Sequence, residues 1–316
     1  MNLEEEFAEH RGELVAHCYR MLGSLHDAED AVQETYLRAW RGHADFEHRS
    51  SVRTWLYRIA TNVCLNLLQH SSRRVVPSAL GAPGNDPDEL HAQALEVPWL
   101  EPFPDQLLGA DPATVVGDRA SLRLAMVAAM QHLPPRQRAV LILREVLTWP
   151  AADVASLLDT TTAAVNSSLQ RARAELARLR PREDELSEPH EPLRRALLDQ
   201  FQAAMESKDL VVLEGLFSAD ARWEMPPIPT WFSGRSDVLR LLDAKLRPGP
   251  GRRVLVETSA NGQPAFALYI RGTDDLFHAH SIKVLTYTED VISAVLAFHQ
   301  PSLFPAFGLP LIHGRS

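Results

Sequence analysis

One segment near the middle of the chain carries polar side chains at a spacing that suits contact with nucleic acid. Asparagine and glutamine amides can pair with the edges of adenine, whereas arginine can contact guanine or phosphate. On a helix these side chains fall on one outer face, which comprises Thr162, Ala163, Asn166, Ser167, Gln170, Arg171 and Arg173. The pattern predicts a DNA-binding surface. The alternative is the solvated polar face of an ordinary helical hairpin.

The apolar residues around this face predict the elements that position it. Residues at the inner positions of two successive helices are Val154, Ala155 and Leu158, then Val165, Leu169 and Ala172. A turn at 159–161 separates the two helices. This arrangement is typical of a helix-turn-helix, whose second helix enters the major groove of DNA.

A second group of side chains combines cations with an aromatic ring, which is the chemistry that grips phosphates and stacks an unpaired base. Its members are Ser51, Arg53, Trp55, Arg58, Asn62, Asn66, Arg73 and Arg74. The preceding helix has a polar outer side suited to a protein partner, formed by Asp27, Asp30, Gln33, Glu34 and Arg38. Taken singly, Trp55 is also a normal core residue, and the arginines are also normal solvated side chains.

Helical spacing of apolar residues extends over most of the first 180 residues. It covers 3–70 with one break at 23–27, and it resumes at about 117–133 and again at 136–179. After residue 190 the pattern changes. One amphipathic helix at 193–207 and a segment at 211–217 precede strand-like runs at 221–225, 253–259, 265–271, 278–286 and 291–298. Helices followed by strands predict a C-terminal α+β domain with a curved antiparallel sheet.

Length, composition and charge bound the class of protein. The 316 residues indicate several domains, and 45% apolar with 23% charged residues is ordinary for a soluble globular chain. The N-terminus is acidic and no apolar run approaches the length of a spanning helix, so we expect a cytoplasmic protein without a membrane segment. Cys18 and Cys64 form no CxxC pair, which excludes a disulfide framework or a thiolate zinc site.

The net charge of −9 is distributed unevenly along the chain. Residues 118–182 hold ten basic and five acidic residues, which suits a nucleic-acid partner. Residues 76–117 hold seven prolines and seven acidic residues but no lysine or arginine. Because such a segment cannot bury a core of its own, we expect an extended linker. Further prolines between 181 and 192 mark a second, shorter linker.

The two polar stretches resemble, in order and spacing, the sigma-70 family of bacterial RNA polymerase sigma factors. The resemblance is to the extracytoplasmic-function (ECF) group, which retains only regions 2 and 4. DAEDAVQETYLRAW, from residue 27, is similar to the polymerase-binding helix of region 2. SSVRTWLYRIATNVCLN, from residue 50, is similar to the segment that melts and recognises the minus-ten element. LPPRQRAVLILREV, from residue 133, with the helix-turn-helix, resembles region 4, which recognises the minus-thirty-five element.

This resemblance assigns roles to individual residues. It adds Trp40 to the polymerase-binding set and Arg136 to the minus-thirty-five set, and it gives the minus-ten role to the set from Ser51 to Arg74. One departure is Val-Asn-Ser-Ser at 165–168, where many such factors have Val-Lys-Ser-Arg. The resemblance also implies that the acidic linker threads through nucleic-acid channels of the polymerase and imitates the charge of RNA there. The alternative is a solvated spacer.

The C-terminal domain is similar to the SnoaL-like, cone-shaped fold shared with ketosteroid isomerases, an extension found in several ECF subfamilies. This fold encloses a pocket, for which the polar candidates are Trp223, Glu224, Trp231, His278, His280 and His299. No carboxylate base with an oxyanion partner stands at a recognisable spacing. His278 and His280 could bind a metal, but no third ligand is evident, so polar pocket or surface histidines are the alternative.

The sequence therefore predicts a transcription initiation factor, not an enzyme, with no cofactor and no metal. Its expected partners are core RNA polymerase, promoter DNA and a small-molecule ligand of the C-terminal domain, which modulates activity. Two rival functions stay open: a conventional DNA-binding regulator, and an enzyme or ligand-binding protein fused to a DNA-binding module. The expected domains are region 2 (1–75), the linker (76–117), region 4 (118–182), the SnoaL-like domain (193–303) and a tail (304–316).

Overall fold

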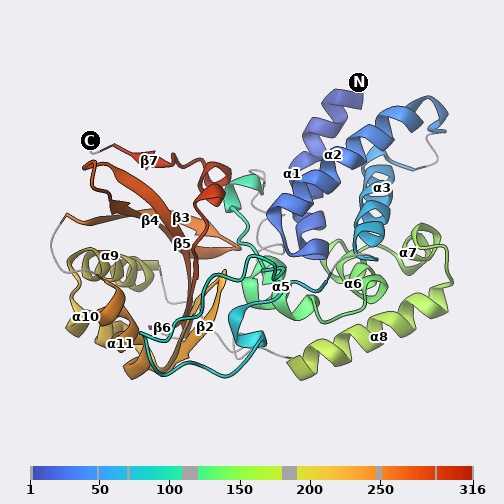
Figure 1. Cartoon of the computed structure of the whole chain (residues 1–316). Helices are drawn as coiled ribbons and strands as arrows, with labels where there is room; N and C mark the ends of the chain where they lie inside the picture. The colour runs from blue at the N-terminus through green and yellow to red at the C-terminus, as the bar shows by residue number, and fades with distance from the viewer. Residues whose placement is uncertain are drawn as a thin grey trace. The chain divides into compact units, whose positions relative to one another are not determined.

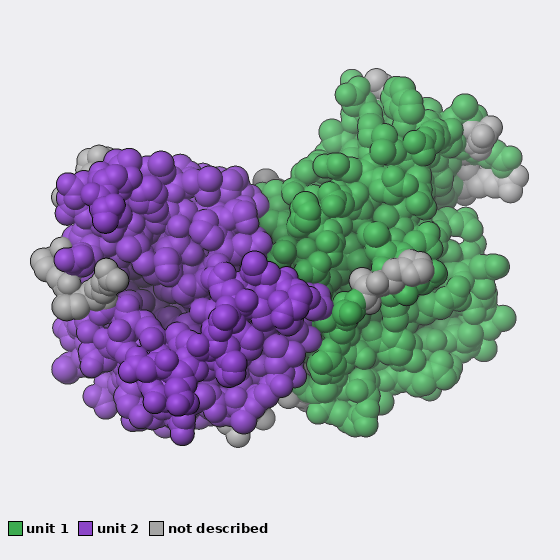
Figure 2. Space-filling view, viewed as in Figure 1, with its two compact units in different colours: residues 1–74, 100–181 green, residues 75–99, 182–316 purple. Residues whose placement is uncertain are grey.

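The computed structural model describes residues 3–47, 50–69, 72–108, 120–179, 191–246, 251–288 and 290–314. The chain divides into two compact units (Figure 2). Unit 1 comprises residues 1–74 and 100–181, and unit 2 comprises residues 75–99 and 182–316. The acidic linker is therefore divided between the two units.

Unit 1 begins with helices that confirm the predicted periodicity. They are α1 (Leu3–Leu22), α2 (Leu25–Gly42) and α3 (Val52–Leu67), with a 3₁₀ turn at His43–Asp45 (Figure 1). Serine side chains begin two of them, because Ser24 Oγ accepts from the backbone N–H of Asp27 at 3.1 Å and Ser51 Oγ accepts from that of Thr54 at 3.1 Å. Such caps satisfy N–H groups that have no partner inside the helix.

The second part of unit 1 contains the predicted helix-turn-helix. Its elements are α5 (Leu124–Met130), α6 (Pro135–Leu141), a π-turn (Ile142–Val146), α7 (Ala151–Leu157) and α8 (Thr162–Leu179). Asp159 takes a left-handed backbone, φ 50°, in the turn between α7 and α8. Val165, Leu169 and Ala172 are buried, as predicted. The expected helix start near residue 117 and most of the second linker lie outside the described residues.

Unit 2 is built on one curved sheet with strand order β2-β1-β6-β5-β4-β3, and β7 pairs with β5. The strands are β1 (Phe217–Met225), β2 (Ile228–Ser233), β3 (Arg253–Ala260), β4 (Gln263–Arg271), β5 (Phe277–Thr288), β6 (Val291–Phe298) and β7 (Ile312–His313). All pairs are antiparallel except β1 with β6, which is parallel. The expectation of a wholly antiparallel sheet is wrong at this pair.

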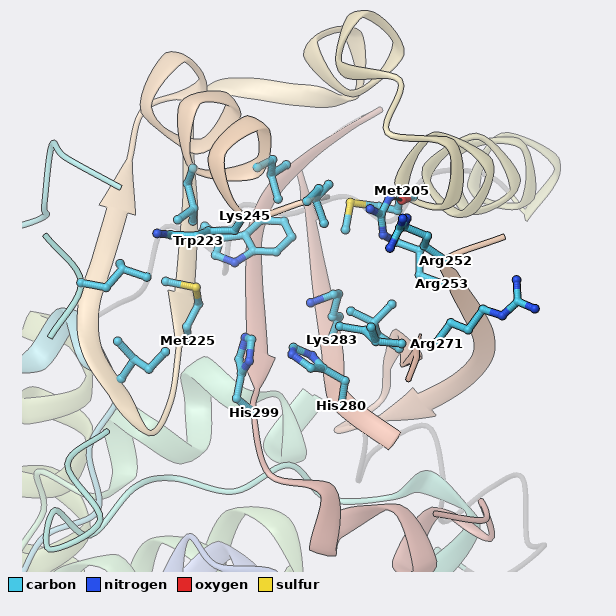
Figure 3. Close-up of a pocket in the computed structure, with 17 residues that line it drawn as sticks. Met205, Trp223, Met225, Lys245, Arg252, Arg253, Arg271, His280, Lys283 and His299 are labelled. Carbon is cyan, nitrogen blue, oxygen red and sulfur yellow. Dashed lines mark hydrogen bonds between the residues drawn. The ribbon is translucent and has the colours of Figure 1, made fainter. Parts of the chain in front are cut away.

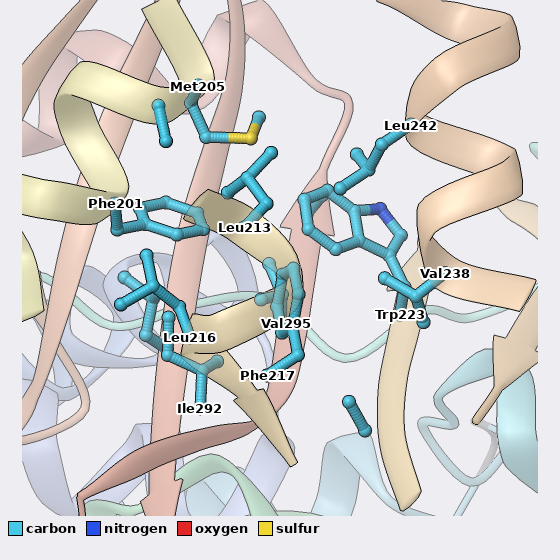
Figure 4. Close-up of a cluster of buried hydrophobic side chains, with 14 of the residues drawn as sticks. Phe201, Met205, Leu213, Leu216, Phe217, Trp223, Val238, Leu242, Ile292 and Val295 are labelled. Atoms are coloured by element: carbon cyan, nitrogen blue, oxygen red, sulfur yellow. The ribbon is translucent and has the colours of Figure 1, made fainter. Parts of the chain in front are cut away.

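The core of unit 2 lies between the sheet and the helices α9 (Glu191–Ser207), α10 (Leu210–Leu216) and α11 (Arg235–Lys245). Phe201 of α9 and Leu213 of α10 pack in one buried cluster with Trp223 and Val295 of the sheet (Figure 4). Burial of a large apolar side chain stabilises the folded state by about 1.5–3 kcal/mol. The helices therefore close one face of the sheet.

Several elements of unit 2 were not expected from the sequence, among them β2 and α11. Pro229 lies inside β2 and suggests a loop, but β2 is an edge strand, where a proline need not donate to a ladder. The C-terminal segment contains a 3₁₀ helix (Pro301–Phe307) and β7, so part of the expected tail joins the sheet. Within the described parts of the chain, no helix is long and apolar enough to span a bilayer.

Candidate nucleic-acid interface and ligand cavity

The predicted DNA-binding face lies on α8 and is exposed along its whole length. All seven predicted side chains of α8, and Arg136 on α6, are exposed. Arg173 is ion-paired with Glu145, Nε to Oε1 2.6 Å, and Arg171 Nη2 lies 3.4 Å from Ser168 Oγ. The face therefore presents amide, hydroxyl and guanidinium groups on a helix whose other side is anchored in the core of unit 1.

The outer side of α2 carries the side chains expected to meet a protein partner. Asp30, Gln33, Arg38 and Trp40 are exposed there, whereas Asp27 and Glu34 are partly buried. Asp27 is ion-paired with Arg74, and Glu34 with Arg38 at 2.7 Å.

Leu37 was missed by sequence reasoning, although its place between Glu34 and Trp40 on the outer side of α2 was a usable signal. It is 46% exposed, and Trp40 is 59% exposed. Exposed large apolar side chains next to each other on a helix mark an interaction surface.

A depression of about 490 Å³ brings together part of the predicted minus-ten set. Trp55, Arg58 and Asn62 line it, together with Arg38 of α2. The Trp55 ring stacks on Phe46 with ring centroids 4.5 Å apart. An aromatic face beside guanidinium and amide groups can hold one unstacked base and its phosphate.

The other members of the minus-ten set have different contacts. Arg53 binds the carboxylate of Glu13 with Nε–O distances of 2.9 Å, and this hydrogen bond raises the pKa of the guanidinium. Arg73 Nη1 lies 2.9 Å from His132 Nδ1. Ser51 caps α3, and Asn66 is exposed outside the depression. The structure therefore brings three of the eight predicted residues into one site.

Unit 2 contains a cavity of about 440 Å³ between the sheet and the helices (Figure 3). Of the six pocket candidates, Trp223, His280 and His299 line it. The His280 and His299 ring centroids are 4.9 Å apart, and burial lowers the pKa of His280 to about 4 and that of His299 well below its usual value. Both imidazoles are therefore neutral near pH 7.

The other three pocket candidates, Glu224, Trp231 and His278, do not line this cavity. The prediction that they line a pocket is therefore wrong for this cavity. Glu224 and Trp231 project from the other face of their strands, since successive strand residues alternate. His278 Nε2 lies 2.9 Å from Asp274 Oδ2. A register shift in the β4–β5 pair leaves His280 as an extra residue between Ala279 and Ser281. This β-bulge lets His280 and Lys283, which lie three positions apart, line the same cavity. The His278 ring is instead held by Asp274 and does not meet His280 in a joint site.

Lys283 was the main cavity residue that sequence reasoning missed. It is 3% exposed, and its Nζ donates to Ser281 Oγ at 3.2 Å and lies 5.2 Å from the centre of the Trp223 ring. Burial lowers the pKa of this amine to about 7. The signal was present in the sequence, because a single lysine interrupts an otherwise apolar strand at 282–285.

The first half of the acidic linker packs on unit 2. Ser78 donates from its N–H at 2.9 Å and from its hydroxyl at 3.1 Å to the carboxylate of Glu224, which is 2% exposed. Burial raises the pKa of Glu224, and the hydrogen bonds from Ser78 oppose that rise. Further along, Gly84 N–H donates to the carbonyl of Trp231 at 2.7 Å, and the Trp231 indole donates to the carbonyl of Gly81 at 3.0 Å. The linker segment 75–99 is thus held by specific polar contacts.

The helix-turn-helix of unit 1, with the exposed polar face of its second helix, is the fold of a DNA-binding protein. The family model of Sigma-70 region 2 matches residues 7–74, and that of Sigma-70, region 4 matches residues 123–176. SigG of Mycobacterium tuberculosis H37Rv, an ECF RNA polymerase sigma factor, is 50% identical over 304 residues, covering 95% of this chain and 82% of SigG. The chain belongs to the ECF group of sigma-70 RNA polymerase sigma factors.

SigJ of the same strain, another ECF RNA polymerase sigma factor, is 27% identical over 254 residues, 78% of this chain and 74% of SigJ. The crystal structure of Mycobacterium tuberculosis SigJ matches with a TM-score of 0.65 at 23% identity, covering 98% of this chain and all of that one. These likenesses confirm the predicted fold class, helical sigma domains with a C-terminal α+β domain. Family membership confirms the predicted function, a factor that binds core RNA polymerase and directs promoter-dependent initiation of transcription.

Proposed function

We propose that the C-terminal domain regulates this sigma factor by holding the linker between regions 2 and 4. The observation that supports this is the pair of hydrogen bonds from Ser78 to the buried carboxylate of Glu224. A buried carboxylate that lost its donors would be costly, so these contacts favour the held linker. The domain acts through this contact and not by catalysis. Because it works with RNA polymerase, we expect the protein in the cytoplasm.

The surfaces of unit 1 make the contacts with promoter DNA and core polymerase, and the held linker controls their use. In this proposal the exposed face of α8 contacts the minus-thirty-five element, and the depression beside Trp55 takes up an unpaired base of the minus-ten element. Leu37 and Trp40 contact core polymerase through the outer side of α2. The acidic linker enters a basic channel of the polymerase, where its charge is complementary. While the linker is held on unit 2 it is not available for that channel, so its release raises initiation.

Gly84 offers a steric test of this regulation. A Cβ added at Gly84 would lie 2.9 Å from Thr230 Cγ2, whereas one added at Gly81 would have no heavy atom within 4 Å. We expect Gly84→Val to loosen the linker, because overpacking costs about 1–3 kcal/mol. Initiation in vitro with core polymerase should then rise by about tenfold, the change that 1.4 kcal/mol produces.

Gly81→Val is the matched control and should initiate at the level of the unchanged protein. Hydrogen exchange of residues 75–99 gives an independent measure of whether the linker has been released. If exchange shows a released linker in Gly84→Val while initiation is unchanged or lower, the proposed regulation is wrong.

A further inference from the structure

The chemistry of the cavity in unit 2 indicates the kind of molecule it binds. Its volume of about 440 Å³ falls within the range of small-molecule sites. Much of its wall is apolar, formed by residues of the linker, the helices and the sheet. These residues are Leu90, Met205, Trp223, Met225, Ile228, Leu241, Leu242, Leu246, Leu268 and Ile270. A ligand that fills this space therefore has an apolar body.

The ionisable side chains among the described residues that line the cavity are all basic, although Lys245 and Arg271 are also ion-paired with Asp88 and Asp275 outside the lining. Those among the described lining residues are Lys245, Arg252, Arg253, Arg271, His280, Lys283 and His299. They come from α11, the start of β3, the end of β4, β5 and the residue after β6, and none of the described lining residues is acidic. A cavity with this lining favours a negatively charged group over a neutral or positive one.

Lys283 marks the place of that negative group. Its amine is buried, and its described contacts are a serine hydroxyl and an indole ring, neither of which carries a negative charge. Buried cations in proteins are normally paired with an anion, because removal from water is costly. Figure 3 shows Lys283 and His280 of β5 and His299, the residue after β6, projecting into the same space. The two neutral imidazoles there can each donate one further hydrogen bond.

We propose that this cavity binds a small organic carboxylate, with the carboxylate on Lys283 and the two imidazoles and the apolar body against Trp223 and the leucines of α11. The ammonium of Lys283 supplies a charge-assisted hydrogen bond, the strong kind that fixes the orientation of a ligand. The proposal does not depend on regulation by the linker, since it concerns binding by the free protein.

The test compares acids with uncharged partners of the same shape. The full chain is titrated with octanoate, decanoate and 4-phenylbutyrate, and with the corresponding alcohols, by calorimetry at pH 7. We expect at least one acid to bind at least tenfold more tightly than its alcohol. In Lys283→Met that preference should be lost. Lys208→Met, which removes a lysine outside the cavity, should retain it.

A second measurement uses the unchanged protein, so the test does not rest on the folding of a variant. At pH 8 the Lys283 amine is largely neutral, and a bound carboxylate should draw a proton onto it. Calorimetry in buffers with different ionisation enthalpies should then show uptake of up to one proton per acid bound, and none for the alcohol. Absence of binding by all three acids, equal binding of acids and alcohols, or a preference that survives in Lys283→Met would each overturn the proposal.

Discussion

Lys283 is a side chain whose ionisation the fold changes through burial alone. The pKa of the folded amine is about 7, against 10.5 in an unfolded chain. Between these values the unfolded state binds more protons than the folded state, so the free energy of unfolding rises with pH. The cost of the buried amine is therefore complete below about pH 7 and is relieved above it. His280 titrates below this window, and burial raises the pKa of Tyr287 above it.

Removal of the Lys283 amine should therefore change how stability depends on pH. We expect the unchanged protein to gain roughly 1 kcal/mol of unfolding free energy per pH unit between pH 7.5 and 9. Lys283→Met should lack this gain and should be the more stable protein at pH 7. Urea unfolding at several pH values measures both effects. Lys208→Met should keep the slope, and an unchanged slope in Lys283→Met would contradict the assigned burial effect.

The spacing of side chains on α8 separates the residues that pack in the core from those that are exposed for contact with DNA. Val165, Leu169 and Ala172 hold the helix in the core of unit 1, which leaves Arg171 and Arg173 on the outside. The recognition segment lacks the two cations that many ECF factors carry at 166 and 168. The remaining arginines of the outer face should therefore supply a large part of its phosphate contacts.

We expect Arg171→Ala combined with Arg173→Ala to weaken promoter binding by the holoenzyme. Each lost phosphate contact should reduce the salt dependence of binding by about one in log–log slope. Affinity for core polymerase should not change. Arg178→Ala is the control, because Arg178 lies near the end of α8, outside the predicted DNA-contacting set, where it is paired with Glu175. A fall in core affinity, or an unchanged salt slope, would argue against the assignment of α8 to DNA.

The linker connects the two units of the molecule and contributes structure to both. Residues 75–99 belong to unit 2, whereas Glu101 lies in unit 1 and accepts from Ser24 Oγ at 2.9 Å. The Asp88 side chain is 88% exposed, and its Oδ1 lies 3.6 Å from Nζ of Lys245. Because an exposed ion pair of this kind adds little stability, Asp88 can bind another cation at little cost. The linker can thus be held in unit 2 through its backbone in the free protein. In the polymerase complex it can contact the basic channel through its acidic side chains.

Reversal of the linker charges at Asp86, Asp88 and Glu89 to lysine should weaken association with core polymerase by about tenfold or more. The proposed channel is basic, and three reversed charges change attraction into repulsion. The neutral variant with asparagine and glutamine at these positions is the control and should show a smaller loss. Affinity is measured by competition for core enzyme. Equal affinities for all three proteins would support a solvated spacer instead.

The sequence alone determined the sigma-factor domains, the helix-turn-helix and the exposed face of α8, because these depend on the spacing of residues close together in the chain. It did not determine where the linker goes or which side chains meet in the cavity. Ser78 meets Glu224 across 146 positions, and only the folded sheet brings them together. A one-residue bulge decides that His280 enters the cavity, and edge position decides that Pro229 can lie in a strand. Pairing between distant segments sets burial and hydrogen bonding, and these give Lys283 and Glu224 their chemistry.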